Sequence, residues 1–228
     1  MLRLNPDKVS LNKAEVPLAY LREQVNRKLF ETGIYSKKDC LNLRNLANAA
    51  LCLRTESCLQ ATDLYELNDG ILGAAVIIAA TGGYNLSTNI KGKHTSPIDI
   101  NAYTGMLLNL ISNACKYSAN RCAKVNVFIN HDHMTVIVTN KLKGKFTLNP
   151  NSLGICAAAQ GARLCNGRLS KFLCGEYVAF TACLPVDTRK AKIYVPAKKS
   201  WEYLADRFSP LYIGLSDISS IPDSLIFN

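Results

Sequence analysis

Histidine is scarce in this sequence, and paired cysteines are missing. The 228 residues include three histidines, none of them before His94, and nine cysteines, no two of which form a C-x-x-C pair. Zinc sites in proteins are usually built from such cysteine pairs and from clustered histidines, so the sequence excludes a zinc site of the common type. We therefore expect the cysteines to be reduced core residues of a cytoplasmic protein.

A long apolar run is also missing. The longest, Ile71–Thr81, falls short of the roughly 20 residues that a membrane-spanning helix needs. The first residues show no signal-peptide pattern. The sequence thus predicts a cytoplasmic protein that does not enter a membrane.

Acidic residues are few. Seventeen Asp and Glu face 27 Lys and Arg, which gives a net charge of +10. This excess favours acidic partners, namely a nucleotide, an acidic receiver protein or nucleic acid, although a solvated lysine surface would give the same count. The basic cluster at 189–199 contains no aromatic residue other than Tyr194 on which bases could stack, so we do not expect nucleic acid as the partner.

The first sixty residues have the pattern of two helices. Apolar residues recur at three- and four-residue steps from about Lys13 to Phe30, and a second such pattern runs from Ser36 to about Ser57. A lone helical hairpin cannot bury both apolar stripes. We predict that residues 1–60 pair with a second copy as a dimeric four-helix bundle, and the alternative is packing against the chain's own domain. The stripe of the second helix consists of Leu43, Leu46, Ala47, Ala50 and Leu53.

Helix and strand patterns alternate along the middle of the chain. A helix is expected at Asp63–Ala80, capped by Thr62 or Asp63, and it is followed by a strand at Tyr84–Ile90. The patterns predict a domain that contains both helices and strands.

The most informative segment is Leu107–Ser118 (LLNLISNACKYS). Asn109 and Asn113 lie four residues apart and share one face of a predicted helix, and Lys116 lies one turn further on. An amide oxygen, a cation and the ring of Tyr117 could hold a metal–phosphate group beside a base. The alternative is an amphipathic helix whose polar side merely faces water.

Leu107–Ser118 resembles the N box of the GHKL nucleotide-binding family, in the histidine kinase form N-L-x-x-N-A-x-K-Y/F-S. The later motifs of that family follow in the correct order, and the resemblance extends from Thr62 to Pro185. It implies three regions, which are a dimerisation hairpin at 1–60, an ATP-binding domain at 61–186 and an extension at 187–228. It also implies an α+β fold for the ATP-binding domain, in which helices cover one face of a mixed sheet as a two-layer sandwich. The matching segments are Lys124–Asn130, Thr135–Asn140, Ser152–Gly167, Arg168–Cys174 and Tyr177–Leu184.

The resemblance assigns roles to the N-box residues. Asn113 matches the family's magnesium ligand, Lys116 would contact a phosphate, and Tyr117 could stack on adenine. Magnesium prefers oxygen ligands and keeps several waters, so one amide with nucleotide phosphates is chemically sufficient. Asn109 stands where the family's hydrolases carry a glutamate, and an amide cannot take the proton from water.

The glycine motifs depart from the family pattern. Asn140 replaces the aspartate that binds the adenine amino group, and Leu142 replaces a glycine, while Gly144 is retained. In the last glycine motif Gly154 is retained, although Ser152 replaces the glycine before it. The lid segment at 141–151 is short and basic, and its lysines could reach phosphates, or it could be an ordinary hairpin loop.

Two hypotheses about function follow, and both depend on the resemblance. Residues 1–93 contain no histidine, so the bundle lacks the family's phosphoacceptor, and we expect no catalytic residues for autophosphorylation. We favour a dimeric pseudokinase scaffold that binds ATP and magnesium weakly or not at all and that docks an acidic partner such as a response regulator. The alternative is an active Mg-ATP-binding kinase acting on another protein. A polyanion binder driven by charge is a third possibility.

Overall fold

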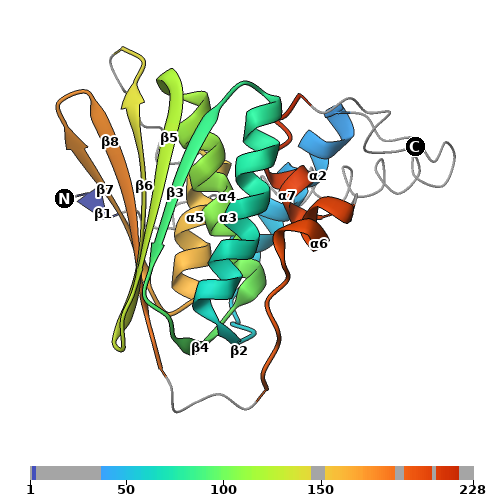
Figure 1. Ribbon diagram of the computed structural model, residues 1–228, viewed down its shortest axis with the longest axis vertical. Coiled ribbons are helices and arrows are strands. Elements are labelled where there is room, and N and C mark those ends of the chain that lie inside the picture. The colour runs from blue at the N-terminus through green and yellow to red at the C-terminus, as the bar shows by residue number, and fades with distance from the viewer. Residues whose placement is uncertain (1, 4–36, 145–151, 188–192, 207–208, 221–228) are drawn as a thin grey trace, which may run out of the picture.

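A computed structural model describes residues 2–3, 37–144, 152–187, 193–206 and 209–220. A six-stranded mixed sheet forms one layer of the molecule, and helices cover one of its faces (Figure 1). Strand β3 runs parallel to β5, and the other neighbours are antiparallel. The strands in spatial order are β1 (Leu2–Arg3), β7 (Arg168–Cys174), β8 (Tyr177–Pro185), β6 (His133–Leu142), β5 (Ser118–Ile129) and β3 (Asn85–Lys91).

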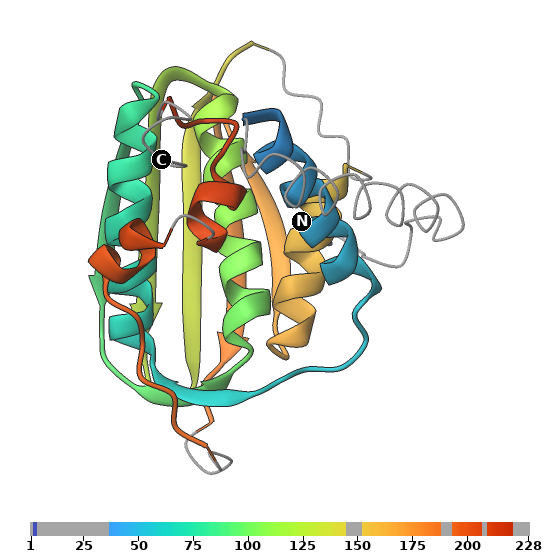
Figure 2. The ribbon, with the colours of Figure 1, turned by 90° about the vertical axis from the view of Figure 1, so that its right-hand side faces the viewer.

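Three long helices form the second layer of the sandwich. They are α3 (Leu64–Thr81), α4 (Ile100–Lys116) and α5 (Leu153–Leu164). Each packs its apolar face on the sheet, and α4 lies between the other two (Figure 2). Helices α4 and α5 approach closely at Gly161, where an added Cβ would lie 2.6 Å from the carbonyl oxygen of Ala102. The predicted two-layer α+β sandwich is confirmed.

Helix α3 is a core helix that begins at a well-formed cap. The Asp63 carboxylate accepts hydrogen bonds from the backbone N–H groups of Tyr65 and Glu66, which satisfies two of the free donors at the helix start. The apolar run Ile71–Thr81 is only part of this helix, and the full helix is long and apolar enough to cross a membrane. In this fold, 56% of that stretch is buried inside the domain.

Three further helices lie on the outer side of the helix layer (Figures 1 and 2). Helix α2 (Lys37–Leu53) packs on α5 and α4, while α6 (Ser200–Ala205) packs on α3 and α7 (Pro210–Gly214) packs on α4 and α2. The second helix of the predicted hairpin therefore packs within its own chain. The first, expected at 13–30, lies outside the described residues.

The buried side of α2 differs from the predicted apolar stripe. Its buried residues include Cys40, Asn48 and Ala49, whereas Ala47 and Ala50 of the stripe are exposed. A mixed face of α2, which contains Asn48 together with small apolar residues, therefore contacts the domain, and part of the apolar stripe remains on the surface.

Five strands were expected, and all five are present as β3, β5, β6, β7 and β8. The sixth is β1, in which Leu2 lies opposite Lys171 of β7. A separate pair, β2 (Gln60–Asp63) and β4 (Thr95–Ile98), was not predicted, because each strand has only four residues.

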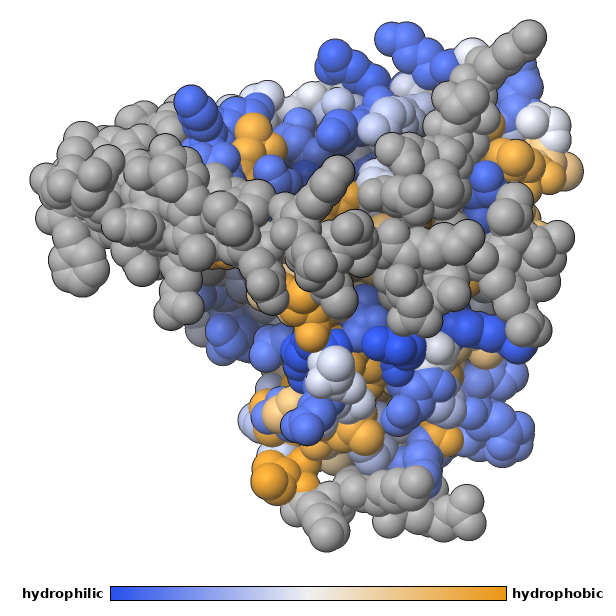
Figure 3. Space-filling view, turned by 180° about the vertical axis from the view of Figure 1, so that it is seen from behind, coloured by the Kyte–Doolittle hydropathy of each residue, from blue (hydrophilic) through white to orange (hydrophobic). Residues whose placement is uncertain are grey.

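The surface is mixed in character. On the face opposite to that of Figure 1, the coloured residues are mainly hydrophilic, and hydrophobic residues form small separate patches (Figure 3). Such scattered exposure is ordinary for a folded protein. The positions at which polar groups are buried are therefore more informative about function.

Candidate functional site

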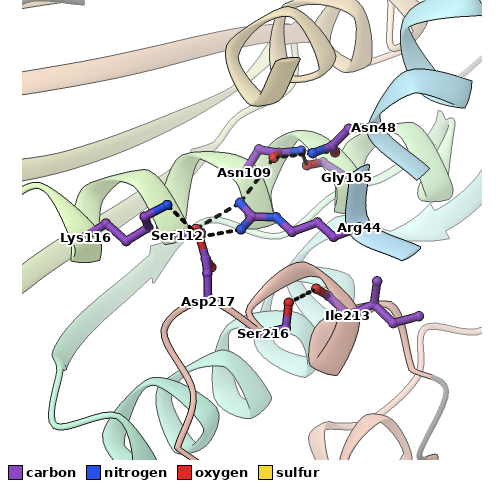
Figure 4. A network of polar contacts seen from close by, with 9 residues as sticks. All are labelled: Arg44, Asn48, Gly105, Asn109, Ser112, Lys116, Ile213, Ser216 and Asp217. Carbon is purple, nitrogen blue, oxygen red and sulfur yellow. Dashed lines mark hydrogen bonds and ion pairs between the residues drawn. The ribbon is translucent and has the colours of Figure 1, made fainter. Parts of the chain in front are cut away.

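The site is built on α4, which contains the N-box-like segment. The carboxylate of Asp99 caps this helix by accepting a hydrogen bond from the N–H of Ala102 at 3.0 Å. The apolar residues of α4 pack in the core, and the polar residues of its other face contact neighbouring elements. Asn109, Ser112 and Lys116 contact α2 or the C-terminal segment, whereas Asn113 lies beside Gly154 of α5 (Figure 4).

Asn109 is buried, and its amide is fully engaged. The side-chain amides of Asn109 and Asn48 bond reciprocally, with Nδ2 of Asn48 donating at 3.1 Å and Nδ2 of Asn109 donating at 2.7 Å (Figure 4). Nδ2 of Asn109 also donates to the carbonyl oxygen of Gly105 at 2.8 Å. With 3% of its surface exposed, Asn109 presents no amide group to solvent.

One turn further along α4, Ser112 and Lys116 contact the carboxylate of Asp217, which lies in the C-terminal segment (Figure 4). Its carboxylate lies 2.5 Å from the Arg44 guanidinium and 3.0 Å from the Lys116 ammonium. The hydroxyl of Ser112 donates to the same carboxylate at 2.8 Å and accepts a hydrogen bond from Arg44 at 2.9 Å. We call Arg44, Ser112 and Lys116 the cation cluster.

The charges in this network decide the protonation of Asp217. Burial by itself would raise the pKa of the carboxyl, but Arg44 and Lys116 outweigh it, so the pKa lies below its ordinary value. Asp217 is therefore ionised at neutral pH. Two cations facing one carboxylate leave the cluster with a net positive charge.

The structure brings together four of the seven predicted site residues. Gly154 begins α5 beside the N-box-like face, where an added Cβ would lie 3.1 Å from Oδ1 of Asn109 and 3.9 Å from Nδ2 of Asn113. Lys116 follows on the same face. These four residues therefore line one end of the contact between α4 and α5.

The other three predicted residues are not part of this group. Tyr117 is 52% exposed, and its ring lies 5.9 Å from the Lys116 ammonium. Asn140 is buried and donates to the carbonyl oxygen of Lys141 at 3.3 Å. Gly144 has a φ of 75°, and no atom lies within 4 Å of its notional Cβ. Most of the predicted lid, residues 145–151, lies outside the described residues.

The residues present fit magnesium and a nucleotide in part. Asn113 is half-buried, and its side chain forms no hydrogen bond with the residues that the structure describes, so its amide oxygen is available to a metal ion. The Asn109 amide and the Lys116 ammonium are already engaged by Asn48 and Asp217. Among the described residues, no group of three or more His, Cys, Asp and Glu could hold a metal.

A cavity of about 380 Å³ adjoins the network between α2, α4 and α7. Its walls are mainly apolar, while Arg44, Asn48 and Asn109 form the side next to the network. Its volume lies within the range typical of small-molecule sites. Leu51, Leu108, Pro210, Ile213 and Gly214 are among the apolar lining residues.

Four residues of the network were missed by sequence reasoning, namely Arg44, Asn48, Ser112 and Asp217. Arg44 and Asn48 lie four residues apart on α2, which places both polar side chains on one helix face. That spacing was a signal available in the sequence. Asp217 interrupts an apolar run, but nothing in the sequence indicates which cation it would meet.

Comparison with known proteins gives a result at the level of the fold. No protein-family model and no curated protein matches the sequence. A structure of the Acinetobacter baumannii histidine kinase AdeS matches with a TM-score of 0.53 at 14% identity, over 75% of this chain and 96% of that one. Full-length ShkA in complex with AMPPNP matches with a TM-score of 0.58 at 16% identity, over 80% of this chain and 47% of that one. The chain therefore shares the fold of these structures.

Proposed function

We propose that this chain is a histidine-kinase-like regulatory protein, a pseudokinase that does not phosphorylate itself on histidine. Its proposed task is to act as a dimeric scaffold for an acidic partner protein such as a response regulator. The observation that supports this most directly is the engagement of Asn109 by Asn48 and of Lys116 by Asp217. Groups expected to face a nucleotide are bound to the chain's own residues.

The positions of the histidines support the same proposal. His94 lies between β3 and β4, and His131 and His133 lie at the turn between β5 and β6. None of them is on α2, and residues 1–93 contain no histidine. The segment expected to form the bundle therefore has no imidazole to accept a phosphoryl group.

The experiment is a calorimetric titration of Mg-ATP into the purified chain, accompanied by incubation with γ-labelled ATP. We expect weak or undetectable heat and no stoichiometric label on the protein. Stoichiometric label would overturn the proposal.

The alternative is an active kinase that binds Mg-ATP and acts on a partner protein. The observation in its favour is that the Asn113 amide has no hydrogen bond to described residues and lies beside Gly154. If this alternative is correct, Mg-ATP binds with micromolar affinity, and Asn113→Ala abolishes the binding because the variant lacks the metal ligand.

The dimer is a separate part of the proposal. The exposed stripe residues Ala47, Ala50 and Leu53 of α2 support it, because a helix surface of this kind can pack against a second helix pair. Light scattering at micromolar concentration should give twice the mass of the chain, 25.0 kDa. A monomer mass would mean that the scaffold acts as a single chain.

A further inference from the structure

We infer that the cation cluster of Arg44, Ser112 and Lys116 is a binding site for a phosphate group, which the chain's own Asp217 fills in this conformation. The inference rests on the proposed function, because it explains how this face of α4 is kept from nucleotides. It adds that the phosphate-binding groups are still present and that Asp217 competes with a ligand for them. A phosphate-bearing ligand would displace Asp217 and loosen the segment around it.

The chemistry of the cluster is that of an oxyanion site. A planar guanidinium, an ammonium and a hydroxyl converge on the two carboxylate oxygens of Asp217, at 2.5 Å, 3.0 Å and 2.8 Å respectively. Charge-assisted hydrogen bonds of this type are the usual means of binding phosphate in proteins. The converging groups also come from different elements, because Arg44 is on α2 while Ser112 and Lys116 are on α4.

The cation cluster is largely buried and is not a chance group of surface side chains. The side chain of Ser112 is fully buried, and that of Arg44 is 11% exposed, so both are fixed in place by their surroundings. Lys116 is 40% exposed and gives the site its opening to solvent. A ligand can therefore approach from the Lys116 side without unfolding the helices.

Charge favours phosphate over the resident carboxylate. Two cations surround a single negative charge, whereas a phosphate monoester carries a charge of about −1.5 to −2 and three acceptor oxygens. The advantage of Asp217 is its attachment to the same chain, which keeps its local concentration high. Phosphate should therefore bind weakly to the native chain and more tightly once the carboxylate is removed.

The segment that carries Asp217 is held by other contacts as well. Leu215 and Ile218 are buried, and Nζ of Lys37 donates to the carbonyl oxygen of Ser219 at 2.9 Å. Displacement of Asp217 is thus expected to loosen residues 216–219 without detaching the domain. The cavity beside Arg44 offers space for the body of a larger phosphorylated ligand.

The test uses the full chain and three probes, which are pyrophosphate, ATP and adenosine, all titrated by calorimetry. Asp217→Asn removes the competing charge and keeps the side-chain shape, so pyrophosphate should bind about tenfold more tightly than to the native chain. Asp132→Asn is the matched control, because it makes the same change at an exposed carboxylate, 71% exposed, in the turn between β5 and β6. We expect no gain in that variant.

Two outcomes overturn the inference. One is equal pyrophosphate affinity in the native chain and Asp217→Asn. The other is a gain that persists when Arg44→Gln is added to Asp217→Asn, because the gain would then come from general charge and not from the cluster. The three probes show which part of a nucleotide is recognised. If pyrophosphate and ATP bind and adenosine does not, the phosphate is the recognised group.

A second measurement covers the case in which Asp217→Asn does not fold. Hydrogen exchange of residues 216–219 in the native chain should accelerate with millimolar pyrophosphate and not with sodium chloride of equal ionic strength. Unchanged exchange overturns the inference. Failure of the proposed function is distinguishable, because that failure would appear as label transfer from ATP, whereas the pyrophosphate experiments involve no phosphoryl transfer.

Discussion

Asn48 of α2 and Asn109 of α4 form a reciprocal pair of amide hydrogen bonds, at 3.1 Å and 2.7 Å, in a buried position. The pair joins an outer helix to the helix that contains the N-box-like segment. Each amide bonds both polar groups of the other, so loss of either residue removes two buried hydrogen bonds from its partner. The N-box asparagine of this chain is therefore part of the packing between two helices.

The first prediction concerns this pair. Asn48→Ala should lower the free energy of unfolding by about 2 kcal/mol, because the buried amide of Asn109 loses a partner on both its oxygen and its nitrogen. Urea unfolding followed by circular dichroism measures the change. Asn45→Ala is the matched control on an exposed position of α2 and should leave stability nearly unchanged. Equal losses in the two variants would contradict the prediction, because the exposed control removes no buried partner.

The second prediction concerns Arg54, whose guanidinium forms an ion pair with the buried carboxylate of Asp99. Arg54→Met should destabilise the chain by about 3 kcal/mol, because the carboxylate that caps α4 would be left without its cation. Thermal unfolding gives the measurement. Arg168→Met, at an exposed site on β7, serves as the comparison. A midpoint shift no larger than that of the comparison would contradict the prediction.

The third prediction is a pH dependence. The pKa of Asp217 is lowered from the ordinary value of 3.8, so its ion pairs stabilise the fold fully above that pH and are lost as the pH falls through the folded-state pKa. The difference in unfolding free energy between the native chain and Asp217→Asn should therefore stay constant from neutral pH to about pH 4 and shrink below it. A difference that already declines near neutral pH would refute this assignment.

The fourth prediction concerns the thiols. All nine cysteines are thiols outside any disulfide, and Cys58 and Cys174 are exposed. Burial raises the pKa of Cys115 and Cys165 to about 12, so these two thiols carry almost no reactive thiolate. A chromogenic disulfide reagent should modify Cys58 and Cys174 first and reach the buried cysteines after unfolding in urea. Equal rates at all nine positions in the native chain would be inconsistent with this fold.

Local patterns were sufficient to predict most elements of the fold. The alternation in Lys124–Asn130 and Thr135–Asn140 gave β5 and β6, and the acid at Asp63 gave the start of α3, because periodicity and capping are local properties. Strand β1 was not predicted, since two residues carry no periodicity and its pairing with β7 spans almost the whole sheet domain. Strands β2 and β4 were missed for the same reason, because each has only four residues.

The site was predicted in part for a similar reason. Asn109, Asn113, Lys116 and Gly154 fall within motifs whose spacing is visible in the sequence, and the fold places them together. The groups that engage two of them, Asn48 and Asp217, come from outside those motifs. Sequence reasoning also placed the contact face of α2 on its apolar stripe, whereas the structure uses the face that contains Asn48.

The sequence by itself determined the alternation of helices and strands, the N-box-like segment, the departures in the glycine motifs and the absence of histidine before His94. Tertiary structure alone decided which polar groups meet. Asn48 and Asn109 are 61 residues apart, and Ser112 and Asp217 are 105 apart. Hydrophobic periodicity fixes which face of a helix is buried, but the partner of a buried polar group depends on how distant elements pack. That packing is a property of the whole chain, because each buried donor and acceptor must find its partner among all the elements that reach it.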